Sequence, residues 1–170
     1  AKLNLALHVR GKLPDGRHAL ETLFAFCVHG DRLSAEPADD LSLTLSGPFA
    51  VLLDDGDHNL VLRAARALQE RAGVSSGAAL HLDKRLPVAS GIGGGSADAA
   101  GALRLLTAMW RIDPAHAAAV APALGSDVPA CLLSMTCRGE GAGDRLDLVD
   151  DPRVTDTPVL LVNPRVPLST

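Results

Sequence analysis

Four glycines within five residues constrain the fold of this chain more than any other part of its sequence: Gly91, Gly93, Gly94 and Gly95. They lie in the run Pro87-Val-Ala-Ser-Gly-Ile-Gly-Gly-Gly-Ser-Ala-Asp-Ala-Ala100. Alternating apolar residues precede this run, and helical spacing follows it as far as Trp110. Each glycine costs the folded state roughly 0.5–1 kcal/mol of backbone entropy relative to alanine. We therefore expect these glycines to form a strand-to-helix loop whose backbone serves the function of the protein.

The loop is suited to binding an anion. Without Cβ atoms, its backbone N–H groups can curl around a ligand while the positive end of the helix dipole faces it. Ser96 adds a hydroxyl, and Lys84 with Arg85 brings positive charge just upstream. Two widespread phosphate motifs are excluded, because Ser follows the glycines where GxxxxGK[ST] needs Lys and GxGxxG needs Gly. A flexible connection that binds nothing stays open as the alternative.

Hydrophobic periodicity predicts the other elements. Strands are expected in four opening segments, paired as an antiparallel meander: residues 3–9, 20–28, 32–36 and 41–45. Another strand is expected at 78–84, and helices over 59–72, after the glycines, from Asp113-Pro114 and briefly from Asp127. Alternation returns between Met135 and Val162. The order predicts an α+β fold in which helices cover one side of a mostly antiparallel sheet.

Composition narrows the class of protein. The 170 residues are 47% hydrophobic but only 2% aromatic, so we expect a core built mainly from Leu, Val and Ala. The net charge of −4 disfavours nucleic-acid binding, and no apolar stretch approaches the roughly 20 residues that span a membrane. Three cysteines without a CxxC pattern favour a reduced, cytoplasmic setting. The chain begins at Ala1 without Met and stops just after an apparent strand, so we expect a fragment.

The glycine run resembles the ATP loop of the GHMP kinases, which include galactokinase, homoserine kinase and mevalonate kinase. Further segments are similar to this family in the same order along the chain: Ala1-Lys2-Leu3-Asn4-Leu5, Asp15-Gly16-Arg17-His18-Ala19-Leu20-Glu21-Thr22-Leu23-Phe24, Asn59-Leu60-Val61, Asp83-Lys84-Arg85-Leu86-Pro87 and Leu124-Gly125-Ser126-Asp127-Val128-Pro129. The resemblance implies that residues 1–170 form the N-terminal, ATP-binding domain of such a kinase, without its C-terminal domain. The implied fold is also found in certain ribosomal proteins.

The doubled glycine at 94 and 95, where many members have Ser-Ser, resembles one branch of the family. The implied acceptor of that branch is the 2-hydroxyl of 4-diphosphocytidyl-2-C-methyl-D-erythritol, in the non-mevalonate route to isoprenoid precursors. The resemblance implies direct in-line transfer of the ATP γ-phosphoryl group, with Mg²⁺ carried on the nucleotide and no metal held by a protein cluster. Neither nucleic acid nor a membrane is an implied partner, and a homodimer is left open. A sister kinase for homoserine or mevalonate, and a non-catalytic nucleotide- or RNA-binding module, are the alternatives.

Two residues are the implied catalytic pair. Asp127 matches the family carboxylate that accepts the proton of the attacking hydroxyl, although its local sequence alone favours a helix N-cap. Lys2 would pair with Asp127 and stabilise developing charge, although alone it reads as a solvated strand end. Asn4 lies two residues further on the same strand face and would hydrogen-bond the substrate.

Thirteen residues are the implied ATP site. The loop itself would surround the phosphates: Pro87, Val88, Ala89, Ser90, Gly91, Ile92, Gly93, Gly94, Gly95 and Ser96. Asn59, Leu60 and Lys84 would bind the adenosine end, and a helix cap and a surface lysine are the alternatives for the two polar ones. Asp98 is expected in the first turn of the phosphate helix, serving its dipole rather than the chemistry.

The remaining implied contacts belong to the acceptor. His18 would read the cytosine edge through its two ring nitrogens, although a lone histidine after a turn is more often a surface residue. Arg17 stands where the family usually has Tyr, and its guanidinium plane can also stack on a base. Ala142, in a glycine-rich turn, and Thr170 complete the predicted substrate residues.

Overall fold

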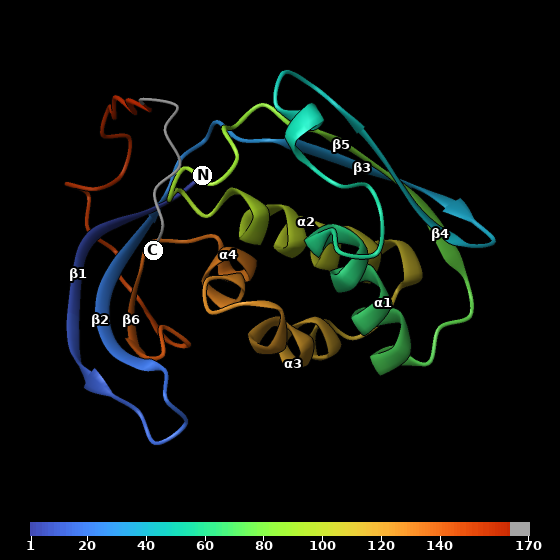
Figure 1. Cartoon of the computed structure of the whole chain (residues 1–170). Coiled ribbons are helices and arrows are strands. Elements are labelled where there is room, and N and C mark those ends of the chain that lie inside the picture. Colours follow the sequence, from blue (N-terminus) through green and yellow to red (C-terminus); the bar gives the residue numbers. More distant parts are fainter. Residues whose placement is uncertain (164–170) are drawn as a thin grey trace.

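A long β-hairpin opens the chain. The computed structural model describes residues 1–163, in which β1 (Lys2–Lys12) and β2 (His18–Phe26) pair antiparallel across a turn at Pro14-Asp15-Gly16. The later strands β6 (Cys137–Gly141) and β7 (Arg145–Leu148) extend this sheet to the order β1-β2-β6-β7. The hairpin reaches well past the helices (Figure 1). The N-terminal strand therefore belongs to the same sheet as the last strand among the described residues.

A second sheet contains β3 (Arg32–Ala38), β4 (Leu41–Ser46) and β5 (Gly77–Asp83), in the order β3-β5-β4. The predicted single meander is wrong at this point, because β3 and β4 both pair with β5, antiparallel and parallel respectively. Alternation identifies a strand but not its partner. The central strand of this sheet is β5, whose Ala78, Leu80 and Leu82 are almost completely buried. The parallel pair is possible because a helix connects β4 to β5.

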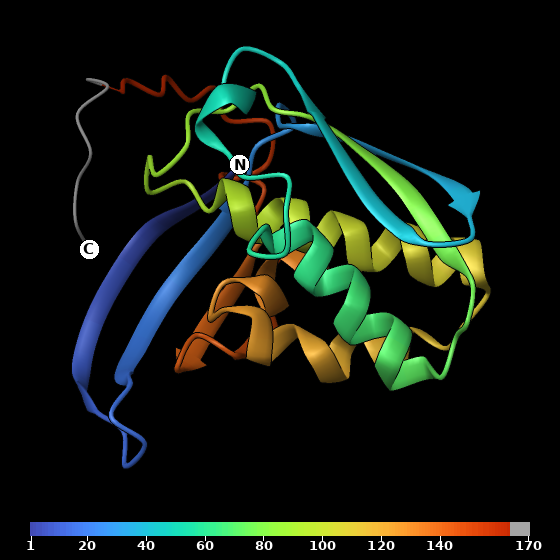
Figure 2. The ribbon, with the colours of Figure 1, turned by 45° about the vertical axis from the view of Figure 1, so that its right-hand side comes forward.

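Two helices, α1 (Leu60–Ala72) and α2 (Gly94–Trp110), lie against this second sheet (Figure 2). The helices α3 (Pro114–Leu124) and the short α4 (Val128–Leu133) pack against α2 and against each other. A single 3₁₀ turn, η1, covers Ala50–Leu52. The core is built from small and branched aliphatic residues, including Leu68, Leu103 and Leu106, as composition predicted. The α+β class is confirmed, with two sheets in place of one.

The four-stranded sheet has a smaller core of its own. Phe24, Ala130 and Cys137 form it, so that α4 packs against β2 and β6. The predicted alternation to Val162 does not continue as a strand, since the last strand among the described residues ends at Leu148. Val159, Leu160, Leu161 and Val162 are exposed and belong to none of the strands within residues 1–163. Within residues 1–163, no helix is long and apolar enough to cross a membrane.

Candidate functional site

The glycine run forms the predicted loop between β5 and α2. Three of its residues have left-handed backbone angles: φ is 52° at Ala89, 74° at Gly91 and 62° at Gly93. Gly93 is the N-cap of α2, and its carbonyl accepts the N–H of Ala97 at 2.9 Å. The N–H groups of the first turn precede any helical acceptor, so they are available to a ligand. The loop geometry is that of an anion site at a helix N-terminus.

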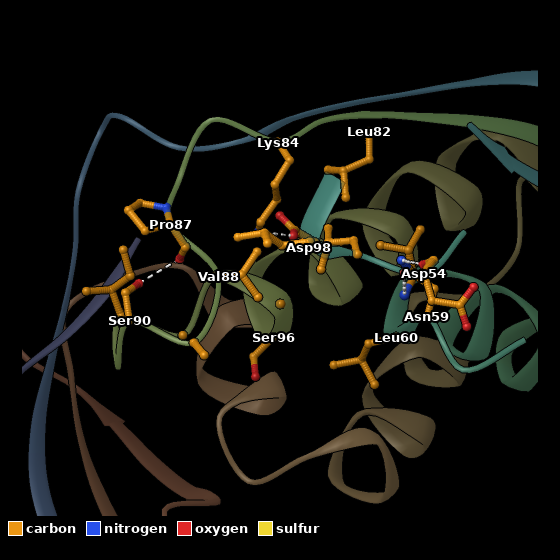
Figure 3. A pocket seen from close by; sticks show the side chains of 18 of the residues that line it. Asp54, Asn59, Leu60, Leu82, Lys84, Pro87, Val88, Ser90, Ser96 and Asp98 are labelled. Carbon is orange, nitrogen blue, oxygen red and sulfur yellow. Dashed lines mark hydrogen bonds and ion pairs between the residues drawn. The ribbon is translucent and has the colours of Figure 1, made fainter. Parts of the chain in front are cut away.

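A cavity of about 440 Å³ lies over this loop, within the usual size of small-molecule sites. All thirteen residues predicted to bind ATP line it: Asn59, Leu60, Lys84, Pro87, Val88, Ala89, Ser90, Gly91, Ile92, Gly93, Gly94, Gly95 and Ser96. Figure 3 shows Pro87 and Ser90 on one side of the cavity and Asn59 with Leu60 on the other. Ser90 is held by a 2.7 Å hydrogen bond to the Pro87 carbonyl. The structure thus gathers these residues into one site.

Asn59 is the N-cap of α1. Its Oδ1 accepts the N–H of Val61 at 2.9 Å, and its Nδ2 donates to the carbonyl of Asp54 at 2.6 Å. The capping alternative is therefore confirmed for this residue. The Asn59 cap fixes the start of α1, and Leu60, the first residue of that helix, lines the cavity. Capping by Asn59 therefore also places an apolar side chain where a nucleotide base could pack.

Lys84 is not a surface lysine. Its ammonium lies 2.7 Å from Asp31 Oδ2 and 2.6 Å from Asp98 Oδ2, and the three side chains are at most 7% exposed. We call this cluster the Asp31–Lys84–Asp98 triad. The predicted dipole role of Asp98 is wrong, because it lies beyond the first turn of α2 and pairs with Lys84. Asp31 was not predicted, since an isolated aspartate after a strand carries no local signal.

The triad carboxylates differ in acidity. Burial raises the pKa of Asp98 to about 6, against the opposing charge of Lys84. Asp31 is also penalised by burial, but hydrogen bonds from Lys84 and from the Leu86 N–H leave its pKa below the ordinary value. Burial prevails at Asp98, which is held mainly by Lys84, whereas backbone N–H groups that donate to Asp31 stabilise its ionised form.

A second ion pair lies on the other side of the loop. Lys2 Nζ is 2.7 Å from Asp127 Oδ2, with Lys2 buried and the carboxylate 31% exposed. The ammonium also donates to Asn4 Oδ1 at 2.9 Å and lies 5.4 Å from the centre of the Phe24 ring. Asp127 holds the N-cap position of α4 but makes no side-chain capping bond. Its carboxylate is thus directed to Lys2 and remains partly open to a substrate.

Thr22 orients the polar group next to this pair. Its hydroxyl accepts from Asn4 Nδ2 at 2.8 Å and donates to the Ala6 carbonyl at 2.8 Å. The amide orientation that results leaves Asn4 Oδ1 facing Lys2. Thr22 is 3% exposed and was not among the predicted site residues. Thr22 is two residues before Phe24, the register partner of Asn4, so alternation along β2 places it on the same sheet face as Asn4, and this is the signal that could have identified it.

The loop and the ion pair are in direct contact. The N–H of Lys2 donates to the Ile92 carbonyl at 2.8 Å. A Cβ atom on Gly93 would lie 2.9 Å from Lys2 Cε and 3.6 Å from Asp127 Oδ2. Gly93 is therefore required both for its left-handed backbone and for the close approach of the lysine. An anion held by the loop would lie beside a partly exposed carboxylate that is paired with an ammonium.

The predicted acceptor residues lie along the same sheet but not in one cluster. Arg17 is half exposed and pairs with Asp15 at 2.8 Å and with Asp144 at 3.5 Å. His18 is exposed, four residues before Thr22 on β2, which corresponds to roughly 13 Å along a strand. Ala142 is buried in the turn between β6 and β7. Thr170 lies outside the described residues.

Comparison with known proteins identifies the class first. Residues 59–135 match the family described as the GHMP kinases N terminal domain. Residues 59–135 thus carry the N-terminal domain of the GHMP kinase family. A homoserine kinase from Cytophaga hutchinsonii, with a TM-score of 0.52 and 18% identity over 81% of this chain and 45% of that one, shares the fold.

Similarity to one kinase type is closer. The chain is 53% identical to the 4-diphosphocytidyl-2-C-methyl-D-erythritol kinase of Hyphomonas neptunium and 52% identical to that of Rhizorhabdus wittichii. Both matches cover the whole chain but only 57% and 59% of those relatives. A crystal structure of 4-(cytidine 5'-diphospho)-2C-methyl-D-erythritol kinase matches with a TM-score of 0.71 and 41% identity, over 89% of this chain and 54% of that one. The chain thus spans a little over half the length of these kinases.

Proposed function

We propose that the protein to which this chain belongs transfers the γ-phosphoryl group of ATP to the 2-hydroxyl of 4-diphosphocytidyl-2-C-methyl-D-erythritol. The reaction would serve the non-mevalonate supply of isoprenoid precursors. The observation that carries the proposal is the contact between Gly93 of the anion loop and the Lys2–Asp127 pair. The names of relatives at about 50% identity support the choice of acceptor.

In this mechanism, the amides of the glycine loop hold the phosphates of ATP. Asp127 accepts the proton of the attacking hydroxyl, for which an ionised, acceptor-only carboxylate is suited. Lys2 orients that carboxylate and offsets the negative charge that develops during transfer. Phosphoryl transfer needs positioning and charge stabilisation more than covalent chemistry, so no phosphoenzyme is invoked.

Mg²⁺ would arrive as part of the nucleotide substrate. Residues 1–163 contain no group of three or more His, Cys, Asp or Glu side chains placed to hold a metal. Oxygen ligands from phosphates and water satisfy Mg²⁺ together with one or two carboxylates. In this proposal the phosphates of ATP are the main ligands of Mg²⁺. A cytoplasmic setting and a homodimer stay predictions from the sequence.

Acceptor specificity would depend on the sheet rather than on the loop. Arg17 is held by Asp15 and Asp144 in an exposed position, so its guanidinium plane can face a base. His18, the next residue and the first of β2, is exposed, so its ring can meet a ligand. Homoserine and mevalonate offer no base for these residues to recognise.

The test is ADP release by the complete gene product with each of three acceptors: 4-diphosphocytidyl-2-C-methyl-D-erythritol, homoserine and mevalonate. Turnover with the cytidyl acceptor alone is the expected result. Turnover with homoserine or mevalonate would keep the kinase and refute the acceptor. Tight ATP binding without turnover on any acceptor would instead indicate a binding module.

The base is tested by Asp127→Asn. The amide retains the shape of the carboxylate but cannot take the proton, so kcat should fall by about 10²–10⁴ while the Kd of a non-hydrolysable ATP analogue stays the same. Asp113→Asn is the matched control, because Asp113 caps α3 away from the cavity and Asn caps equally well. Equal kcat values for the two variants would refute the assignment.

A further inference from the structure

Three segments of the chain meet at the Asp31–Lys84–Asp98 triad. Lys84 directly follows β5, Asp31 lies between β2 and β3, and Asp98 is in α2. The triad stands between two cavities, because Asp98 lines both the cavity over the glycine loop and a second one of about 420 Å³ behind it. Figure 3 shows Lys84 extending to Asp98 at the edge of the first cavity. The wall between the cavities therefore depends on these ion pairs.

Lys84 is presented from a fixed backbone. Its N–H donates to the Ser46 carbonyl at 2.7 Å, and its carbonyl accepts from the Phe49 N–H at 3.2 Å. Gly47 is packed against the same peptide, since a Cβ there would lie 2.6 Å from the Lys84 oxygen. The Lys84 side chain is consequently fixed at its base by these backbone contacts and at its ammonium by the two carboxylates.

The triad contacts both ends of the glycine loop. At the start of the loop, Asp31 Oδ1 accepts the N–H groups of Arg85 at 2.6 Å and Leu86 at 2.8 Å. At its end, a Cβ on Gly94 would lie 3.2 Å from Lys84 Nζ. An ammonium beneath the first turn of a helix opposes the helix dipole, and the two carboxylates offset that charge. The buried cluster is thus hydrogen-bonded to the start of the loop and packed closely against its end.

We propose that Asp31 and Asp98 are positioning residues for ATP binding, which act through Lys84 to hold the two ends of the glycine loop in the geometry that binds phosphates. The inference rests on the proposed ATP site and adds to it two residues that need not touch the nucleotide. Two of the three Lys84 N–H donors are already used by the carboxylates. Lys84 accordingly serves the site chiefly by its position.

Asp31→Asn breaks one link of the cluster and keeps the other contacts. The amide oxygen can retain both backbone N–H bonds, which turns the NH₂ group toward Lys84 and places donor against donor. Asp98→Leu removes the second link without leaving a buried charge, whereas Asp98→Asn keeps an oxygen that faces Lys84. Asp98→Asn is thus the conservative variant that should rescue the loss seen with Asp98→Leu.

Asp83→Asn is the control. Asp83 is one residue from Lys84, but it pairs with the exposed Arg85 at 2.6 Å and does not line the loop cavity. Its variant removes the same charge from the same stretch of chain without changing the triad. All four variants are made in the complete gene product.

Three measurements test this proposal, and two of them, nucleotide affinity and hydrogen exchange, do not depend on the proposed function. Titration calorimetry with a non-hydrolysable ATP analogue should give a Kd about tenfold higher for Asp31→Asn and Asp98→Leu, and within threefold of wild type for Asp98→Asn and Asp83→Asn. Steady-state rates should show the same order in the KM for ATP, with kcat within threefold. Hydrogen exchange in the nucleotide-free protein should be about tenfold faster at residues 91–97 in the first two variants and unchanged in β6.

The outcomes are distinct. Unchanged Kd and unchanged loop exchange in Asp31→Asn would refute the proposal even if Asp98→Leu failed to fold. An Asp98→Asn variant as impaired as Asp98→Leu would also refute it, because charge rather than the link would then matter. The expected exchange and Kd differences without acceptor turnover would support the positioning role and refute the kinase assignment.

Discussion

Gly93→Ala is the most informative single substitution, because Gly93 joins the anion loop to the Lys2–Asp127 pair. The residue has φ of 62°, and an added Cβ would lie 2.9 Å from Lys2 Cε and 3.2 Å from Lys2 Cβ. Gly73, at the end of α1, has φ of 66° and nothing within 4 Å of the same added atom. Gly73→Ala is therefore a control that introduces the backbone strain without the contact.

The expected effects can be worked out separately. A left-handed alanine costs roughly 1–2 kcal/mol in either variant. In a chain of this size, that lowers Tm by roughly 2–8 °C. At Gly93, carbon atoms need about 3.5 Å, so Lys2 must withdraw by roughly 0.6 Å or more from its place beside Asp127. Displacements of about 1 Å at reacting groups lower rates by about 10²-fold.

The assay is ADP release by the complete gene product at saturating ATP and acceptor, together with thermal unfolding. We expect similar Tm losses in the two variants, normal kcat in Gly73→Ala and a kcat about 10² lower in Gly93→Ala. A Gly93→Ala enzyme with kcat within threefold of Gly73→Ala would show that the contact with Lys2 has no catalytic meaning.

Three further outcomes are expected. Because the pKa of Asp98 is raised to about 6, its favourable contribution to stability is complete below about pH 4 and is lost as pH rises through 6. The free energy of unfolding of Asp98→Asn, measured with urea, should therefore rise by roughly 3 kcal/mol relative to wild type between pH 4 and pH 7. A difference between the two proteins that does not change with pH would contradict this. Asn59→Ala removes the cap of α1 and should cost about 1 kcal/mol in the same experiment, whereas an unchanged midpoint would mean that the cap is dispensable. Arg17→Ala should raise the KM for the cytidyl acceptor about tenfold with the KM for ATP unchanged, and equal changes in both would exclude a role in base recognition.

Local features of this protein could be predicted from the sequence. The loop at Gly91–Gly95, the cap of α3 at Asp113-Pro114 and the hairpin turn before β2 all lie where the pattern indicated. Glycine conformations, caps and hydrophobic periods involve neighbours within one or two turns of chain, so a short window contains the physical cause. The thirteen residues assigned to ATP also line one cavity, although their roles stay a prediction.

The sequence alone thus determined most of the helices and strands up to β7, the glycine loop and the composition of the core. Only the tertiary structure decided that β5 separates β3 from β4, and that Lys2 reaches Asp127 across Gly93. It also decided that Asp31 joins Asp98 around Lys84, where the sequence pattern indicated a surface lysine or a nucleotide contact. The physical reason is that strand pairing and buried ion pairs depend on which distant segments share a desolvated space, and local patterning does not specify that choice.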